Sequence, residues 1–340
     1  MIKFFRKIRQ RLLSENKFSK YLIYAFGEII LVVIGILLAL QINNWNQERT
    51  QQKAVKTALE QIQNELLNDL TQSYNLTAYL ERKDSIIERV LKDEVTENDY
   101  KTYGNLRYLI RNTRVFTLNR DGYTSLMNII DESKFSNPEL LSALKNLYVD
   151  RNKNHERVNG WFSDFVHEYN NELTNNYLWH SSTDALIDSL TQSEIDYLLY
   201  DPLYKNKVAR YRNLGIGNLN NDNYGLQVVM AHLYNSISEV TEKGIDNNII
   251  ASYFKSPTDS ISAPFLGTYT YDGDESFKLF QEQDSLKIQI FPSDQVFHLV
   301  GGQRNRFQIY NSSFQFVIVN DSTLRDVSTW RVRYNKVKDN

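Results

Sequence analysis

The sequence contains no cysteine in 340 residues. It therefore forms no disulfide, offers no thiolate nucleophile and lacks the ligand that zinc fingers and iron–sulfur clusters require. Proline is scarce as well, since only Pro138 and Pro202 fall within the first 250 residues. Because proline removes a helix hydrogen bond, long stretches without it favour helices.

The chain as a whole also lacks a large excess of positive or negative charge. The net charge is −2, which argues against a general nucleic-acid-binding protein. Hydrophobic residues make up 41% of the chain and aromatic residues 13%, which is enough apolar surface to build folded cores. A disordered or low-complexity protein is therefore excluded.

Motifs of catalysis and cofactor binding are absent too. Ser125 does not lie in a G-x-S-x-G turn, no glycine-rich phosphate loop occurs, and the five histidines show no H-E-x-x-H spacing. The pairs His155-Glu156 and His167-Glu168 lack the second histidine that such a metal site needs. We therefore expect no catalytic residue, no metal ion and no cofactor.

The positive charge of the chain is concentrated at its N-terminus. Residues 1–20 carry a net charge of +6, so the rest of the chain sums to −8. The next segment, Tyr21–Ile42, contains one charged residue, Glu28, in 22 residues. As a helix it would be about 33 Å long, enough to cross the hydrocarbon core of a bilayer. We predict a basic cytoplasmic tail at 1–20 and a transmembrane helix at 21–45.

A cleaved signal peptide is the alternative for this segment. The apolar run is longer than the roughly 7–15 residues typical of such a peptide, and no small-x-small cleavage site follows it. An uncleaved anchor is therefore favoured. Basic residues precede the span and none occurs in the NNWNQE that follows it. The positive-inside rule then predicts a cytoplasmic N-terminus in the inner membrane and a periplasmic C-terminal bulk.

The same region resembles a known family. The segment GEIILVVIGILLALQINNWN, from Gly27 to Asn46, closely matches the pattern GEI-x-LVVIGI-x-x-ALQINNWN. This pattern is shared by a Bacteroidota family classed as domain of unknown function 6090. The resemblance implies a single-pass envelope protein of a two-membrane bacterium. It implies no activity, because that family is uncharacterised.

Three residues of the predicted membrane helix share one face. Gly35 and Ala39 are 7 and 11 residues after Glu28, so at 100° per residue each lies within about 20° of Glu28 around the helix. Gly35 and Ala39 let two helices approach closely, and an acid within a span usually has a partner. We predict that this face contacts another membrane helix, in a homo-oligomer or in a different subunit. Alternatively, Glu28 reaches the lipid headgroups and pairs with a nearby lysine.

Residues 46–255 are predicted to form a helical domain. From Glu48 to Leu91 there is neither proline nor glycine, and apolar residues from Val55 to Leu66 repeat at steps of 4, 3 and 4. The repeat ends at Asp69 after less than two heptads, so a helix packed on its neighbours is favoured over a long coiled coil. Further helices are predicted to begin at Asn137-Pro138, at the capping box Thr191–Glu194 and at Asp201-Pro202. The helical stretch 221–243 is predicted to end at Gly244.

Two side-chain patterns stand out in this helical region. Arg107, Arg111 and Arg114 are spaced to share one helix face, where they would form ion pairs or, less favoured, bind an anion. The aromatic residues between Trp161 and Tyr169 follow a helical period and are expected in the core.

The composition changes near Lys255. Residues 256–264 form a linker-like run, after which apolar residues alternate with a period of two, as at Leu286, Ile288 and Ile290. Turn signals, Gly301-Gly302 among them, separate six or seven short strands over 265–338, which predicts an antiparallel barrel or sandwich. The FLGTYTY segment and the SLKIQIF strand resemble small lipocalin-like domains, which implies a ligand in the barrel mouth. A closed module that docks on the helical domain is the alternative. The fold class is mainly α with a C-terminal all-β domain.

One triplet recurs after the membrane span. Bacteroidota O-glycosylation uses acceptors that resemble Asp-Ser/Thr followed by a small or aliphatic residue. The sequence offers candidate acceptors at Ser85, Ser189, Ser260, Ser285 and Ser322. Asp-Ser is also common in turns and caps, which is the structural alternative.

Two classes of function remain. The favoured one is a non-enzymatic membrane protein that acts as a scaffold, accessory subunit or ligand-sensing module, with membrane lipid and a protein as partners. The other is a membrane-anchored periplasmic enzyme acting on glycan, lipid or peptide. Two carboxylates about 5–10 Å apart in a cleft would favour the enzyme.

Overall fold

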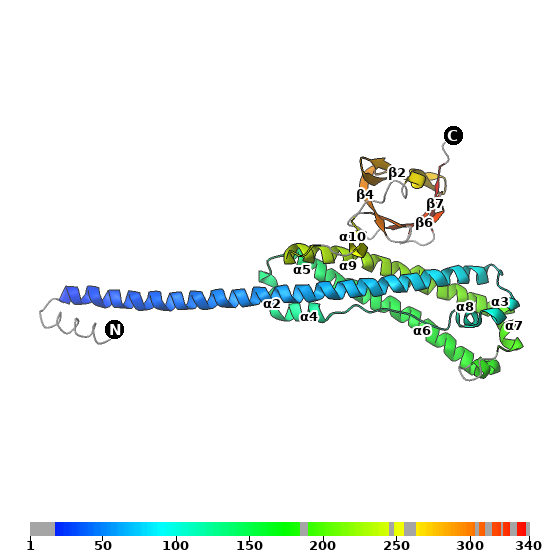
Figure 1. Cartoon of the computed structure of the whole chain (residues 1–340), viewed down its shortest axis with the longest axis horizontal. Helices are drawn as coiled ribbons and strands as arrows, with labels where there is room; N and C mark the ends of the chain where they lie inside the picture. The colour runs from blue at the N-terminus through cyan, green and yellow to red at the C-terminus, as the bar shows by residue number, and fades with distance from the viewer. Residues whose placement is uncertain are drawn as a thin grey trace. The chain divides into compact units, whose positions relative to one another are not determined.

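The computed structural model describes residues 18–183, 190–244, 248–254, 263–302, 306–309, 315–320, 322–326 and 332–337. Over these residues the chain is mainly helical and ends in a barrel of antiparallel strands (Figure 1), which confirms the predicted fold class. The chain divides into two compact units, residues 1–58 and 59–340. Most of the predicted tail and linker lies outside the described residues.

Helix α2 (Phe18–Leu91) belongs to both units. In the first unit its large apolar side chains from Ile29 to Ile42 are exposed, as expected of a helix that lipid surrounds. In the second unit Leu59, Ile62 and Leu66 are buried, so the predicted apolar stripe is confirmed. Asp69 and the later Ser73 do not end this face, because both are buried as well.

The other helical elements of the described residues lie in the second unit. They are α3 (Glu97–Thr102), η1 (Gly104–Tyr108), α4 (Asp121–Ile129), η2 (Glu132–Lys134), α5 (Pro138–Lys145), η3 (Asn146–Arg151), α6 (Asn152–Asn176), η4 (Leu178–Thr183), α7 (Gln192–Tyr200), α8 (Pro202–Arg212), η5 (Asn213–Leu219), α9 (Asn220–Thr241), α10 (Asn248–Ala251) and η6 (Ala263–Phe265). The π-helical segments η3 and η5 each join two α-helices, so residues 138–176 and 202–241 are helical throughout.

Polar contacts set the direction in which these helices run. Gln63 of α2 donates to Ser238 at 2.6 Å, and Gln227 donates to Ser73 at 3.1 Å, so α9 is antiparallel to α2. Lys207 pairs with Glu172, and the Tyr211 ring packs on the Phe162 ring, so α8 is antiparallel to α6. The second unit therefore has a bundle core of three long helices (Figure 1).

Most of the predicted helix boundaries are confirmed, with two corrections. Asn137 and Asp201 accept backbone hydrogen bonds at 2.9 and 2.7 Å, and a proline follows each. Thr191 also caps its helix, but the Glu194 carboxylate turns into the core instead of completing a capping box. Helix α9 ends before Gly244, because Glu242 adopts a left-handed conformation (φ 60°) and closes the helix.

The C-terminal domain is a closed barrel of eight strands in sequence order. The strands are β1 (Gly267–Tyr271), β2 (Asp274–Glu282), β3 (Ser285–Ile290), β4 (Gln295–Gly302), β5 (Arg306–Ile309), β6 (Gln315–Asn320), β7 (Thr323–Asp326) and β8 (Arg333–Lys336). Each strand is antiparallel to the next, and β1 pairs with β8 to close the barrel. The barrel has more strands than the sequence predicted, and Gly301-Gly302 belongs to β4 instead of a turn.

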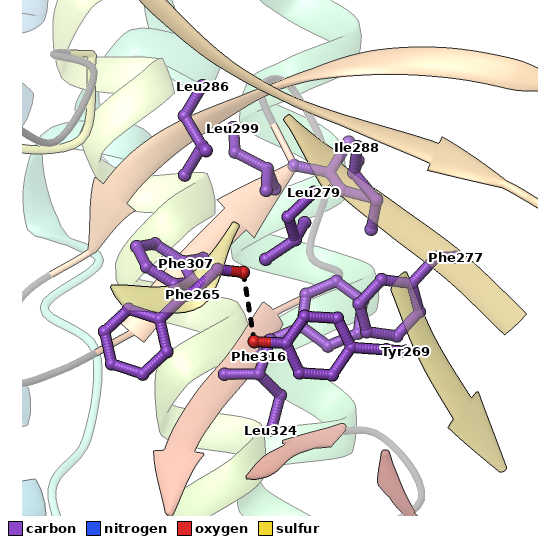
Figure 2. Packing of buried hydrophobic residues seen from close by; sticks show 11 residues of the cluster. Phe265, Tyr269, Phe277, Leu279, Leu286, Ile288, Leu299, Phe307, Phe316 and Leu324 are labelled. Carbon is purple, nitrogen blue, oxygen red and sulfur yellow. Dashed lines mark hydrogen bonds between the residues drawn. The ribbon is translucent and has the colours of Figure 1, made fainter. Parts of the chain in front are cut away.

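Apolar side chains fill the interior of the barrel (Figure 2). Tyr269 stacks on Phe277 with ring centres 5.0 Å apart, and the Tyr269 hydroxyl donates to the Phe265 carbonyl at 3.0 Å. An eight-stranded barrel has an interior just wide enough for such side chains. The predicted alternation is confirmed at Leu286 and Ile288, which are buried in this cluster. A packed core argues against a ligand inside the barrel.

One buried arginine connects the barrel with the helices. Arg306, at the start of β5, donates to Glu81 of α2 at 3.0 Å, and its guanidinium lies over the ring of Tyr224. Burial lowers the pKa of Arg306, while Tyr224 and Glu81 oppose that effect. This contact favours the interpretation that the barrel docks on its own helical domain.

We expect Gly215→Ala to destabilise the bundle. A Cβ atom at Gly215 would lie 2.8 Å from the ring of Phe162, which is fully buried in α6. Overpacking of this kind costs about 1–3 kcal/mol. Gly160→Ala is the matched control, because its Cβ would meet nothing within 4 Å, and alanine favours a helix over glycine by about 1 kcal/mol. Chemical denaturation of the detergent-solubilised chain measures both, and equal stability of the two variants would contradict this packing.

Candidate functional site

The predicted membrane-helix face is present on α2. This helix is the one in the described residues that is long and apolar enough to cross a membrane. Because α2 is unbroken, Glu28, Gly35 and Ala39 lie on one side of it as the spacing predicted. A Cβ atom at Gly35 would meet nothing within 4 Å. The contact of this face with another helix stays a prediction.

Residues 112–120 are neither helix nor strand, and Phe116 and Leu118 among them are buried, whereas most of the others are exposed. Their backbone groups therefore need partners other than a helix or strand. The Phe116 carbonyl accepts from His155 at 2.9 Å and from Asn159 at 2.8 Å. The Asn112 carbonyl accepts from the Tyr211 hydroxyl at 3.0 Å. Side chains of α6 and α8 thus hold this segment.

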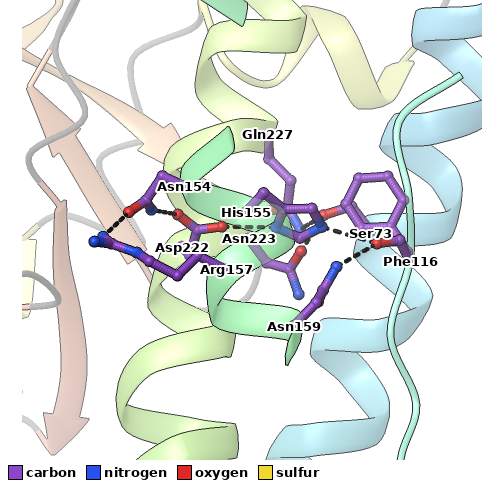
Figure 3. A network of polar contacts seen from close by, with 9 residues as sticks. All are labelled: Ser73, Phe116, Asn154, His155, Arg157, Asn159, Asp222, Asn223 and Gln227. Atoms are coloured by element: carbon purple, nitrogen blue, oxygen red, sulfur yellow. Dashed lines mark hydrogen bonds and ion pairs between the residues drawn. The ribbon is translucent and has the colours of Figure 1, made fainter. Parts of the chain in front are cut away.

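His155 holds the bundle together through hydrogen bonds of its ring (Figure 3). Besides its contact with Phe116, the buried His155 has Nδ1 2.7 Å from the Asp222 carboxylate of α9. Both ring nitrogens of His155 are thus engaged in hydrogen bonds. Asp222 also accepts from Asn154 at 2.6 Å. His155 therefore links three parts of the bundle and has no nitrogen left for a metal ion.

Two carboxylates of α2 hold the end of the same segment. Asp69 accepts from the Asn119 backbone N–H at 2.9 Å, and Glu65 accepts from that of Gly122 at 3.0 Å. Burial raises the pKa of Asp69 to about 6, the hydrogen bond from Asn119 lowers it, and the Glu65 charge raises it. This carboxylate pair is used in backbone hydrogen bonds and lines neither of the two pockets described in the bundle.

A pocket with both polar and apolar lining surface lies where the 112–120 segment begins. Its volume is about 850 Å³, and we call it the Arg111 pocket. It is formed by the end of η1 and the turn after it, the end of α6, and η4. Its lining residues are Tyr108, Arg111, Asn112, Thr174, Asn175, Asn176, Tyr177, Leu178, His180 and Ser181.

A buried ion pair lies next to Arg111 of this pocket. Arg107 donates twice to Glu194 of α7, with distances of 3.1 and 2.5 Å, and their side chains are 3% and 1% exposed. Arg111, 9% exposed, lies 3.9 Å from the same carboxylate. Two guanidinium groups thus lie near one carboxylate, and one of them, Arg111, also lines the pocket.

Neighbouring side chains fix the orientation of Arg111. Its Nη2 donates to His180 Nδ1 at 2.9 Å, which places the His180 proton on Nε2 because arginine cannot accept. The guanidinium lies 5.1 Å from the ring centre of Tyr108. Asn170 donates to the Arg111 carbonyl at 2.9 Å and anchors its backbone. Arg111 is therefore held on both its main chain and its side chain.

An aromatic cluster supports the opposite wall of the pocket. The Tyr177 ring packs 4.7 Å from that of Tyr197, and the Trp179 ring packs 5.4 Å from it. Burial raises the pKa of Tyr197, which keeps its hydroxyl neutral. The cluster holds η4 against α7.

The prediction that Arg107, Arg111 and Arg114 share one helix face is wrong. The chain leaves its helical path after η1, so the three arginines share no helix face. Arg107 forms the favoured ion pair, and Arg114 lies 4.5 Å over the ring of Tyr79. Sequence reasoning missed Glu194 and His180 as neighbours of Arg111, because both are distant in the chain. Glu194 lies 87 residues after its partner Arg107, and His180 lies 69 residues after Arg111.

The other predicted residues have scattered environments. His167 is exposed on α6, and the described residues hold no group of three potential metal ligands. Of the candidate acceptors, Ser85 and Ser322 are exposed and Ser285 is half-buried at the start of β3. Ser189 and Ser260 lie outside the described residues. Of the predicted aromatic core, Phe162 and Tyr169 are buried, whereas Trp161 is exposed.

We expect Asp69→Asn to change how stability depends on pH. The folded pKa of about 6 lies above the ordinary value of 3.8, so the folded state takes up a proton before the unfolded chain does. The contribution of Asp69 to the free energy of unfolding is therefore lowest above pH 6 and rises as the pH falls toward 4. The variant keeps an oxygen for the Asn119 N–H but cannot be ionised.

The advantage of Asp69→Asn over wild type should thus be largest at pH 7 and shrink toward pH 4. Urea denaturation across this range measures it, and Asp121→Asn at an exposed position is the control. A constant difference between Asp69→Asn and wild type would show that Asp69 is not the titrating group.

Comparisons with known proteins identify one relationship. Residues 28–179 match the Family of unknown function (DUF6090). Searches of curated proteins and of solved structures found no match. The matched segment includes the membrane-helix face, the 112–120 segment and most of the Arg111 pocket lining. The similarity to the Family of unknown function (DUF6090) thus extends over residues 28–179 of this chain.

Proposed function

We propose that this chain is a single-pass inner-membrane protein whose second unit works in the periplasm by binding and not by catalysis. The observation that carries the proposal is the exposure of α2 between Ile29 and Ile42. Exposed leucine, isoleucine and valine along several helical turns are costly in water and stable in lipid. The +6 charge of residues 1–20 supports a cytoplasmic N-terminus.

The polar side chains of the bundle support binding over catalysis. The close carboxylates Glu65 and Asp69 hold backbone N–H groups, and both ring nitrogens of His155 are engaged in hydrogen bonds. General acid–base catalysis needs such groups within reach of a substrate. Here Asp69 and His155 hold the 112–120 segment, and Glu65 holds the start of α4.

The partner in the membrane is a second helix on the Glu28–Gly35–Ala39 face. Gly35 leaves space for a neighbouring backbone, since a Cβ atom there meets nothing within 4 Å. Close approach of helices at small residues is a main source of association in lipid, where apolar surface alone gives none. We propose a second copy of this chain as the partner, with a different subunit as the other outcome of the test.

Topology is the first prediction of this proposal. Alkaline phosphatase fused after Asn340 should be active in cells, because that enzyme folds in the periplasm, while a fluorescent protein at the same place should be dark. The reciprocal fusions before Met1 are the control. An inactive C-terminal phosphatase in cells that contain the full-length fusion would reverse the orientation.

Assembly in the membrane is the second prediction. Glu28→Gln and Gly35→Leu should each reduce the crosslinked dimer and lower the native mass of the solubilised complex. Leu37→Phe is the matched control, because residue 37 lies about 180° around the helix from Glu28. If both face variants assemble as the wild type does, this face contacts lipid and not a second helix. If the complex contains a different subunit, that subunit and not a second copy of the chain is the partner.

A further inference from the structure

Lys83 of α2 is a half-buried lysine with aromatic neighbours. Its Nζ lies 5.0 Å from the ring centre of Tyr79 and 4.9 Å from that of Tyr211. The adjacent acid in the chain, Asp84, is paired with Arg212 at 2.6 Å. Within the part of the chain that the structure describes, Lys83 has no carboxylate partner, so nothing there stabilises its charged form as an ion pair would.

Two neutral oxygens hold the amine of Lys83 in place. Its Nζ donates to the Tyr211 hydroxyl at 2.9 Å and lies 3.5 Å from the Asn112 carbonyl. Because the Tyr211 hydroxyl donates its own proton to that carbonyl at 3.0 Å, its oxygen accepts from the amine. A neutral amine has two N–H bonds for these two acceptors, and it keeps a lone pair. That lone pair makes the nitrogen a nucleophile.

Arg114 places a second positive charge near the amine. Its guanidinium lies 4.5 Å from the ring centre of Tyr79, the same ring on which Lys83 packs. Burial and, next, the charge of Arg114 lower the pKa of Lys83 from 10.5 to about 8. Burial raises the pKa of Tyr79 and that of Tyr211, so neither hydroxyl supplies an anion to oppose this effect. Desolvation and a neighbouring cation are the conditions that activate a lysine toward carbonyl compounds.

Arg114 also offers a place for an acidic group. It is exposed, and among the described residues its guanidinium packs on the Tyr79 ring without a hydrogen bond or an ion pair. Asn112 is exposed as well, so the amine of Lys83 lies at the edge of the surface, within reach of a small solute. A guanidinium binds a carboxylate through paired N–H groups. A molecule that carries both a carbonyl group and a carboxylate therefore suits this pair of residues.

We propose that Lys83 is a covalent modification site, which forms an imine with an aldehyde or ketone whose carboxylate is held by Arg114. The nitrogen lone pair attacks the carbonyl carbon, and a proton moves from nitrogen to the carbonyl oxygen to give a carbinolamine. The carbinolamine then loses its hydroxyl group and the second nitrogen proton as water, and the carbon–nitrogen double bond forms. No oxidant or reductant is consumed, and water reverses the step. The site is separate from the membrane-helix face and independent of assembly there.

Reductive trapping on the full-length protein in detergent tests this step. The probes are succinic semialdehyde and butanal, two four-carbon aldehydes of which only the first carries a carboxylate. Cyanoborohydride reduces an imine to a stable amine, and peptide mass spectrometry then gives the extent of labelling at each lysine. Lys92 is the internal control, because the hydrogen bond and charge of Glu88 raise its pKa. Near neutral pH we expect succinic semialdehyde to label Lys83 at least tenfold faster than Lys92, since far more of Lys83 is neutral.

Variants test the role of the guanidinium. In the wild type, the rate ratio of succinic semialdehyde to butanal should be at least fivefold higher at Lys83 than at Lys92, and Arg114→Gln should remove this preference. The ratio of the two probes cancels the change that loss of the Arg114 charge makes in the pKa of Lys83. Arg157→Gln is the matched control, because Arg157 is also exposed and packs 4.9 Å over the ring of Trp161. Lys83→Arg keeps a positive charge but cannot form the imine, so its label at this position should be lost.

Three results would overturn the proposal. These are the absence of a trapped product at Lys83 in the folded protein, labelling of Lys83 no faster than that of Lys92, and an unchanged probe preference in Arg114→Gln. Thermal unfolding of each variant shows that it is folded under the conditions of the labelling.

Discussion

The backbone of residues 112–120 imposes the constraint on which the helical domain depends. This stretch has no helix or strand of its own, yet Phe116 and Leu118 within it are buried. A buried backbone group without a partner costs several times what a typical hydrogen bond contributes. Polar side chains of the bundle therefore bond several of its backbone groups. Their positions on α2, α6, α8 and α9 then determine how those helices pack.

This constraint explains why so many polar residues lie in the core. Asp69 on α2 and Asn159 on α6 each bond a backbone group in the segment. His155 bonds the segment on one side and Asp222 of α9 on the other. Such contacts specify one register of the helices more sharply than apolar packing does, because a shift by one residue would leave several groups unpaired. The raised pKa of Asp69 is a cost of that arrangement.

The Arg111 pocket follows from the same segment. Arg111 and Asn112 lie where the chain leaves η1, and hydrogen bonds from Asn170 and Tyr211 fix their carbonyls. A helix continuing through residue 114 would have turned Arg111 onto a surface stripe, as the spacing of the arginines suggested. The break in the helix instead places Arg111 next to Glu194 and His180. The pocket is thus a product of irregular backbone held by a regular bundle.

The sequence by itself determined the features that depend on local patterns. The apolar run of Tyr21–Ile42 requires a lipid-compatible helix, and alternation of the kind seen at Leu286 and Ile288 requires strands with one buried face. Helix starts at Asn137 and Asp201 were also predictable, because a cap and its proline are neighbours in the chain.

Only the tertiary structure decided which polar residues are buried and what they contact. Glu194 had the spacing of a capping box, but the attraction of Arg107, distant in sequence, outweighed that local bond. The eight-stranded closure of the barrel likewise depends on β1 meeting β8. Such pairings join residues far apart in the chain, and no short-range pattern encodes them, because their free energy arises only once the helices and strands have packed.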